Sequence, residues 1–301
     1  STTLDEMAVA GEQCCEGVTY LDWRLPIANV LPTGYHRLDI ESDGRSVSSL
    51  LLAAPRAACS LPATGGRRWG VFLPLYALHS HRSCGAGDFS DLESLNEWVA
   101  ELGGSLVASL PLLAAFYGQE GDESPYRPAS RLFWNEFFLV LAQVPELACG
   151  LGEAPIGPSQ AERLRAERLV DYAGQMQWKR RLIEPAVRRL FEQPSPRRDA
   201  CLEFAGRHPE LGEYARFRAT EERHARPWTK WPQPLRDGHI PRGSYDEAAY
   251  HYHVYVQWLL DGQLTRLVER ARARGLTWYL DLPLGVHPDG YDAWRHRAVF
   301  A

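Results

Sequence analysis

The stretch Leu276-Thr-Trp-Tyr-Leu-Asp-Leu-Pro-Leu-Gly-Val-His-Pro-Asp-Gly-Tyr-Asp-Ala-Trp294 joins a short apolar run to a polar and aromatic loop. The run ends at Asp281, and Pro283 and Gly285 then stop the strand that it predicts. A buried strand that ends in a carboxylate and opens into a loop is how an α/β barrel presents polar groups at its functional face. A core strand followed by a solvated turn would explain the same residues. Motifs elsewhere in the chain are needed to choose between these two interpretations.

A strand–helix–strand unit is predicted upstream of this stretch. Trp69–Leu78 and Ser105–Leu112 are apolar runs of the kind that form buried strands. Between them Asp88 is placed to cap a helix with one apolar face, and Gly103-Gly104 is placed to end it. The short helix-to-strand turn predicts parallel pairing. A long helix from Ser244 to Gly275 then leads into the opening stretch, so three parallel strands are expected.

The first 65 residues predict a small β region. Tyr20–Leu25, Tyr35–Glu41 and Ser48–Ala54 are expected to be short strands, and Ser42-Asp-Gly-Arg45 is a hairpin-type turn. Three strands cannot close a sandwich. This region is therefore interpreted as the last part of a β domain, or as a β layer that leans on the next part of the chain.

Composition limits the function classes. The 301 residues are 45% hydrophobic and 24% charged, as in an ordinary globular protein, and the net charge of −5 disfavours nucleic acid or an anionic membrane as the partner. Six cysteines without a C-x-x-C pattern predict reduced thiols. No apolar run approaches the roughly 18 residues of a membrane span, and the first residues lack a signal-peptide pattern. A cytoplasmic protein is expected.

Several motifs follow one another along the chain in a recognisable order. They are Tyr35-His36, Trp69–Ser80, Gly85–Leu92, Leu110-Pro-Leu112, Ser124–Ser130 with Asn135-Glu-Phe137, His253–Trp258 and Asp281-Leu-Pro283. Together they resemble the 4-α-glucanotransferases (amylomaltases or disproportionating enzymes), and the resemblance covers nearly the whole chain. The chain departs from the family pattern at Leu78-His-Ser80 and within Ser83–Asp88, and the family often has Asn-Pro-Leu where this chain has Asn135-Glu-Phe137.

The resemblance implies an α/β fold that is part of a (β/α)8 (TIM) barrel. Residues 1–65 would be the small N-terminal β region, and residues 66–112 the first two barrel strands and their helix. Residues 113–245 would be a mostly helical insertion with a substrate loop. Residues 246–301 would hold the next helix, the third barrel strand and the loop after it. A closed barrel needs about eight strands.

The resemblance also implies an enzyme that cleaves an α-1,4-glucan and passes the glycosyl part to another sugar with retention of configuration. Retention needs two carboxyl groups about 5–5.5 Å apart, one as nucleophile and one as acid/base. In the family these residues lie on strands after the third. No catalytic residue is therefore assigned here, no cofactor is expected, and the 301 residues alone are predicted to be inactive.

Three residues are candidates for substrate binding through the same resemblance. Ser124-Pro-Tyr126 is similar to the family's glucan-contacting loop after the second strand, and Asp281 to its substrate-binding carboxylate at the end of the third. Asp281 would accept hydrogen bonds from sugar hydroxyls. The alternatives are a tyrosine that fills a gap in a loop and an aspartate that caps neighbouring N–H groups.

Other polar residues have weaker claims. His79, His81 and Arg82 could contact substrate, although the first loop departs from the family there. His287, Asp289 and Asp292 match no recognised metal-site spacing, so loop polarity is favoured and no metal is expected. Three acidic residues, Glu162, Glu167 and Asp171, are interpreted as part of a solvated helix face.

Aromatic residues gather in two places. Phe133, Trp134, Phe137 and Phe138 could form a sugar-stacking platform, but such a cluster is more often the core of an insertion. Trp228 and Trp231, flanked by prolines, are better candidates for sugar stacking at the surface.

Three interpretations stay open. The chain could be the N-terminal portion of a glucanotransferase that acts on maltooligosaccharides, with its C-terminal half missing here. It could be a non-catalytic half-barrel that binds glucan or a protein partner, since three parallel strands would expose a sheet edge that normally requires a partner. A second chain could instead complete the barrel.

Overall fold

The computed structural model describes residues 8–24, 31–42, 44–57, 68–118, 122–148 and 158–300. The chain divides into two compact units, Ser1–Gly65 and Gly66–Ala301. The second unit contains Tyr126, Asp281 and the other candidate site residues.

The N-terminal unit holds two antiparallel hairpins. β1 (Ala8–Cys15) pairs with β2 (Val18–Arg24), and β3 (Gly34–Ser42) pairs with β4 (Arg45–Ala53). The turn of the first hairpin has positive φ at both Glu16 and Gly17, which suits the right-handed twist of its strands. The predicted hairpin is confirmed by the antiparallel pairing of Ser42 with Arg45, whereas β1 was not predicted. Leu25, expected at the end of a strand, lies outside the described residues.

A three-stranded parallel sheet forms the base of the second unit. β5 (Gly70–Phe72), β6 (Leu106–Ser109) and β7 (Thr277–Leu280) lie in that order, so the predicted parallel pairing is confirmed. The first strand is shorter than predicted. Pro74 has no N–H to give to a ladder, and the chain turns there into the 3₁₀ helix η2 (Leu75–Ala77).

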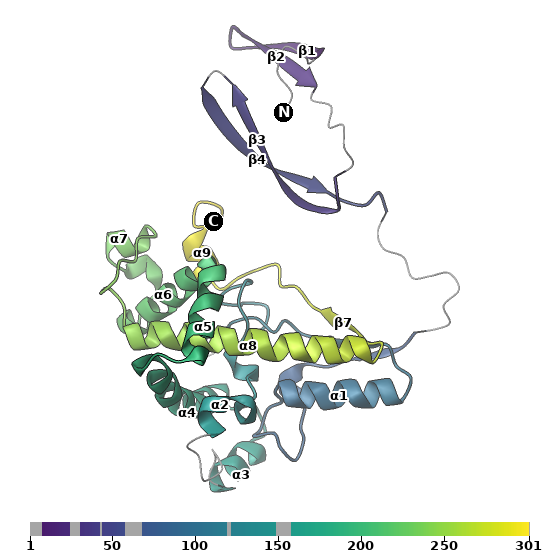
Figure 1. Cartoon of the computed structure of the whole chain (residues 1–301), viewed down its shortest axis with the longest axis vertical. Coiled ribbons are helices and arrows are strands. Elements are labelled where there is room, and N and C mark those ends of the chain that lie inside the picture. The colour runs from purple at the N-terminus through teal and green to yellow at the C-terminus, as the bar shows by residue number, and fades with distance from the viewer. Residues whose placement is uncertain are drawn as a thin grey trace. The chain divides into compact units, whose positions relative to one another are not determined.

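Two helices lie beside this sheet and beside each other: α1 (Phe89–Glu101) and α8 (Glu247–Ala273) (Figure 1). Asp88 caps α1 by accepting from the N–H groups of Ser90 and Asp91, as its position predicted. Asp246 caps α8 by accepting from the N–H of Ala249. α1 joins β5 to β6 and α8 delivers the chain to β7.

The segment between β6 and α8 is mostly helical. α4 contains Pro185 but continues through it. The described elements are η3 (Glu136–Phe138), η4 (Leu141–Gln143), α2 (Pro145–Ala148), α3 (Pro158–Ala166), α4 (Tyr172–Glu192), α5 (Pro196–Arg207), α6 (Pro209–His224), η5 (Trp228–Lys230) and α7 (Gln233–Arg236), with α9 (Tyr291–Arg295) after β7.

The aromatic cluster of this segment is core rather than a platform. Phe133, Phe137 and Phe138 are buried, and the Phe133 ring stacks on Tyr214 of α6 at 4.0 Å between centroids. Trp231 is only 3% exposed, so it is not a candidate for sugar stacking at the surface. Burial of these large rings supplies much of the apolar contact that holds the helices together.

Candidate glucan-binding site

Two of the three predicted site residues meet in the structure. The hydroxyl of Tyr126 donates a 2.7 Å hydrogen bond to Oδ2 of Asp281, across 155 positions of sequence. Tyr126 comes from the loop after β6 and Asp281 directly follows β7. Because the strands are parallel, their carboxyl ends lie at one edge of the sheet, where such loops converge.

The sheet itself positions Asp281. Its N–H donates to the carbonyl of Ser109 at 3.2 Å, which extends the ladder between β6 and β7 by one step. Asp281 therefore lies at the last step of the β6–β7 ladder, where the loop begins. Leu73 makes the matching bond after β5, from its N–H to the Ala108 carbonyl at 3.0 Å.

Backbone bonds join the Tyr126 loop to the segment after Asp281. The His287 N–H donates to the Pro128 carbonyl at 2.9 Å, and the Tyr291 N–H donates to the Ala129 carbonyl at 2.7 Å. Gly290 makes this approach possible, since a Cβ there would lie 2.5 Å from the Ala129 carbonyl oxygen.

A buried carboxylate strengthens the same junction. Asp292 accepts from the Ser130 hydroxyl at 2.6 Å and from the Arg131 N–H at 2.8 Å. Its role is therefore to hold the two loops together, and it does not point to a metal. Among the described residues, no group of three or more His, Cys, Asp or Glu side chains is placed to hold a metal ion.

His287 is also part of the scaffold. Its Nδ1 accepts from the Asp289 N–H at 3.1 Å, so the proton lies on Nε2, which donates to Asp122 at 3.2 Å. The ring packs edge-on against Phe116. These contacts favour the loop-polarity interpretation of this histidine.

The Tyr126–Asp281 pair is open to solvent on one side. Tyr126 is 48% exposed, and its hydrogen bond to the Asp281 carboxylate raises the pKa of the phenol. A carboxylate can accept more than one hydrogen bond, and an exposed ring offers an apolar face. Together they can bind a ligand that carries both hydroxyl groups and C–H faces.

Ser124 is the first residue of a turn that has Pro125 and Tyr126 at its centre. Its carbonyl accepts from the Arg127 N–H at 3.0 Å, which closes the turn. Among the described residues, Ser124 makes no hydrogen bond to Tyr126 or Asp281. The structure thus brings two of the three candidates together and leaves Ser124 beside them.

The loop after β5, residues 79–87, is hydrogen-bonded to two neighbouring helices. Arg82 donates to the Ser94 hydroxyl of α1 at 2.8 Å, and Arg165 of α3 donates to the carbonyls of His81 and Ser83. These bonds give Arg82 a structural role. Substrate contact by His79, His81 and Arg82 stays a prediction.

Sequence reasoning missed a polar hollow of about 510 Å³ near this site. Its lining comes from the segment around Phe116, from α4 and α6, and from the segments at Trp228 and His287. Trp228 is half-buried, and its indole N–H donates to the Pro288 carbonyl at 2.9 Å. Arg218 and Glu222 lie four positions apart on α6, so the two charged side chains share one face of that helix. This spacing was the feature of the sequence that could have indicated the hollow.

An ion pair borders this hollow. Arg180 of α4 donates through both terminal nitrogens to Glu222, at 2.8 and 2.9 Å, and His253 of α8 bonds to the same carboxylate at 2.7 Å. Burial alone would raise the pKa of Glu222, but His253 and Arg180 outweigh it and hold that pKa well below its usual range. Burial lowers the pKa of His253, although its contact with the Glu222 carboxylate opposes that effect.

Comparison with known proteins identifies the family. A sequence family described as 4-alpha-glucanotransferase matches residues 73–301. The chain belongs to this family. A 4-alpha-glucanotransferase of Mycobacterium tuberculosis strain H37Rv is 30% identical over 292 residues, which cover 90% of this chain and 40% of that protein. One from Haemophilus influenzae is 26% identical, with 90% of this chain and 42% of that protein covered.

Solved structures agree on the fold. Amylomaltase from Corynebacterium glutamicum matches with a TM-score of 0.65 at 24% identity, over 95% of this chain and 40% of that one. Amylomaltase from Streptococcus agalactiae in complex with acarbose matches with a TM-score of 0.62 at 21% identity, over 78% and 47%. This chain thus has a mixed α/β fold like theirs and spans about 40% of the length of the first relatives it matches. No helix in its described part is both long and apolar enough to cross a membrane.

Proposed function

We propose that these residues belong to a 4-α-glucanotransferase that transfers α-1,4-glucan segments between maltooligosaccharides with retention of configuration. The observation that carries the proposal is the 2.7 Å bond between Tyr126 and Asp281. It joins loops from two neighbouring parallel strands in a chain that matches the family from residue 73 onward. A partly exposed tyrosine and a carboxylate suit a sugar, which has apolar faces and many hydroxyl donors.

The proposed fold is the first part of a (β/α)8 barrel. β5, β6 and β7 would be its first three strands, residues 113–245 its helical insertion, and residues 246–301 the helix, strand and loop of the third unit. Residues 1–65 would form a separate β region. The parallel order of the sheet and the position of α1 and α8 support this organisation.

In this proposal Asp281 accepts hydrogen bonds from two hydroxyls of one glucose unit, and Tyr126 fixes the carboxylate's orientation and packs against the sugar. Ser124 borders the same loop and contributes a further polar contact. The nucleophile and the acid/base carboxyl, which must lie about 5–5.5 Å apart, are proposed to lie on later strands of the full-length protein.

The experiment compares two polypeptides. The full-length product of the gene that encodes these residues should release glucose from maltotriose and form longer maltooligosaccharides, whereas the 301 residues alone should release none. Chromatography of the products measures both. A full-length product without this activity would overturn the proposal, and glucose release by the 301-residue chain would overturn the assignment of bond cleavage to later strands.

A further inference from the structure

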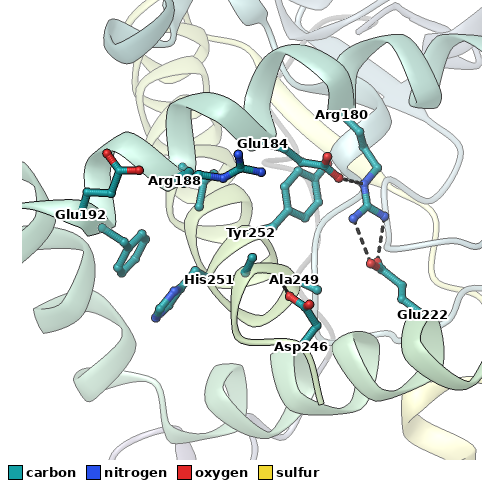
Figure 2. Close-up of a pocket in the computed structure, with 12 residues that line it drawn as sticks. Arg180, Glu184, Arg188, Glu192, Glu222, Asp246, Ala249, His251 and Tyr252 are labelled. Atoms are coloured by element: carbon teal, nitrogen blue, oxygen red, sulfur yellow. Dashed lines mark hydrogen bonds and ion pairs between the residues drawn. The ribbon is translucent and has the colours of Figure 1, made fainter. Parts of the chain in front are cut away.

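A second pocket lies among the helices, apart from the loops of Tyr126 and Asp281. It has a volume of about 420 Å³, within the range of about 300–1,000 Å³ for small-molecule sites. Its walls come from α4, α6 and α8, as Figure 2 shows. No residue that lines this pocket belongs to the two loops that carry Tyr126 and Asp281, called the first site from here on.

One side of the pocket is apolar. Val187 of α4 and Ala248 and Ala249 of α8 contribute small aliphatic groups. Beside them the rings of Phe191 and His251 stack with centroids 4.0 Å apart and planes only 9° from parallel. Burial lowers the pKa of His251, which favours the neutral form of this stacked ring. The wall therefore suits the C–H face of a ligand.

A guanidinium group is available on the same wall. Arg188 extends from α4 over the pocket toward Tyr252 (Figure 2), and no carboxylate within the described residues pairs with it. Its neighbour Arg180 differs, since Glu184 and Glu222 both bind it. Arg188 can therefore donate two parallel N–H groups to a ligand without first breaking an ion pair.

Carboxylate oxygens face the pocket as acceptors. Glu184 gives Oε1 to Arg180 at 2.9 Å, and Asp246 gives Oδ1 to the Ala249 N–H at 2.9 Å. Each group has a second oxygen that accepts no hydrogen bond from the described part of the chain. These oxygens can accept from hydroxyl groups of a ligand.

The charges of the lining select the class of ligand. Arg180 and Arg188 face four carboxylates, those of Glu184, Glu192, Glu222 and Asp246, so the balance is two positive against four negative. An anion is repelled by this excess. A compact cation would meet the guanidinium of Arg188. A neutral ligand with several hydroxyls satisfies both the donor and the acceptors, and its C–H face fits the apolar wall.

We propose that this pocket is an accessory binding site for a neutral saccharide of one or two hexose units. The choice of an α-glucan as that saccharide rests on the proposed function. A long glucan held here by one part and at Tyr126–Asp281 by another would be retained between transfers. The helical segment would thereby add affinity for long chains without taking part in bond cleavage.

The experiment measures maltotetraose binding to the 301-residue chain by isothermal titration calorimetry. An Asp281→Asn variant, which weakens the first site, should still bind maltotetraose. Adding Arg188→Gln to it should weaken that binding at least tenfold. Adding Arg189→Gln, at the next position of α4, which is also exposed, should not change it. Thermal unfolding of each variant checks that the fold is kept.

Three outcomes would overturn the accessory site. Asp281→Asn could abolish all binding, Arg188→Gln could leave the residual binding unchanged, or glucose 6-phosphate or spermidine could bind in an Arg188-dependent way where maltotetraose does not. None of these touches the proposed function, which the transfer activity of the full-length product tests separately. Loss of that activity with intact Arg188-dependent binding would overturn the proposed function alone.

Discussion

The hydroxyl of Ser130 donates a 2.6 Å hydrogen bond to Asp292, which lies 162 positions further along the chain. Asp292 is only 4% exposed, so its carboxylate depends on such donors in place of water. The bond joins the loop that carries Tyr126 to the segment that follows Asp281. The geometry of the candidate glucan site therefore depends on residues that would not touch the sugar.

Ser130→Ala should destabilise the second unit by about 1–3 kcal/mol, because it leaves a buried carboxylate with one donor fewer. Urea denaturation followed by tryptophan fluorescence measures the loss. Thr229→Ala serves as the control, since that hydroxyl is exposed in η5. Equal stability of the two variants would show that the Ser130 bond contributes nothing.

Gly290→Ala should disturb the same junction by steric means. The added Cβ would lie 2.5 Å from the Ala129 carbonyl oxygen, so the Tyr126 loop must shift, at a cost of about 1–3 kcal/mol. Gly118→Ala is the matched control, because a Cβ there meets nothing within 4 Å. Both the free energy of unfolding and maltotetraose affinity should fall for the first variant and stay unchanged for the second.

Tyr126→Phe should lower kcat/KM of the full-length enzyme for maltotriose about tenfold, since it removes the donor that orients Asp281. Asp281→Asn should lower it further, because the amide replaces an acceptor oxygen with a donor. Tyr20→Phe, an exposed tyrosine of the N-terminal unit, controls for loss of a phenol elsewhere. Unchanged kinetics in Tyr126→Phe would refute an orienting role.

The free energy of unfolding should decrease in acid because Glu222 becomes protonated. Its pKa is held below the usual range of a glutamate in the folded state, so the ionised form stabilises the fold at pH values above the unfolded pKa, about 4.3. This stabilisation should be lost progressively as the pH falls below that value. Urea denaturation between pH 7 and pH 3 measures the slope.

Glu222→Gln tests this assignment. The variant should be less stable at pH 7, because Arg180 and His253 lose their carboxylate partner, and its stability should depend less on pH in the acid range. Glu203→Gln on the exposed side of α5 should keep the original slope. If Glu222→Gln kept that slope too, the acid sensitivity would belong to other carboxylates.

Helices were predicted well where an N-cap residue directly preceded a segment with one apolar face. Asp88 precedes an apolar stripe and caps α1 with a full capping box, so both signals came from residues within one segment. β1 escaped prediction because its residues are nearly all exposed and show no apolar alternation. The strand predicted from Trp69 to Leu78 was too long, since an apolar run alone does not say where Pro74 ends the ladder.

The candidate site was predictable only through the resemblance. Tyr126 and Asp281 were chosen from motifs in separate segments, and the sequence gives no sign that their side chains bond to each other. Arg180 and Glu222 could not be paired either. On their own helices they are charged residues of the kind that usually face solvent, and only the packing of α4 against α6 and α8 makes them partners.

Arg180 and Glu222 line both the polar hollow and the helical pocket. The two spaces therefore share a wall made of one ion pair rather than of backbone. A molecule that displaces the guanidinium on one side removes a donor from the other side at the same moment. Thermodynamic reciprocity then requires that occupancy of either space alter affinity in the other by the same factor.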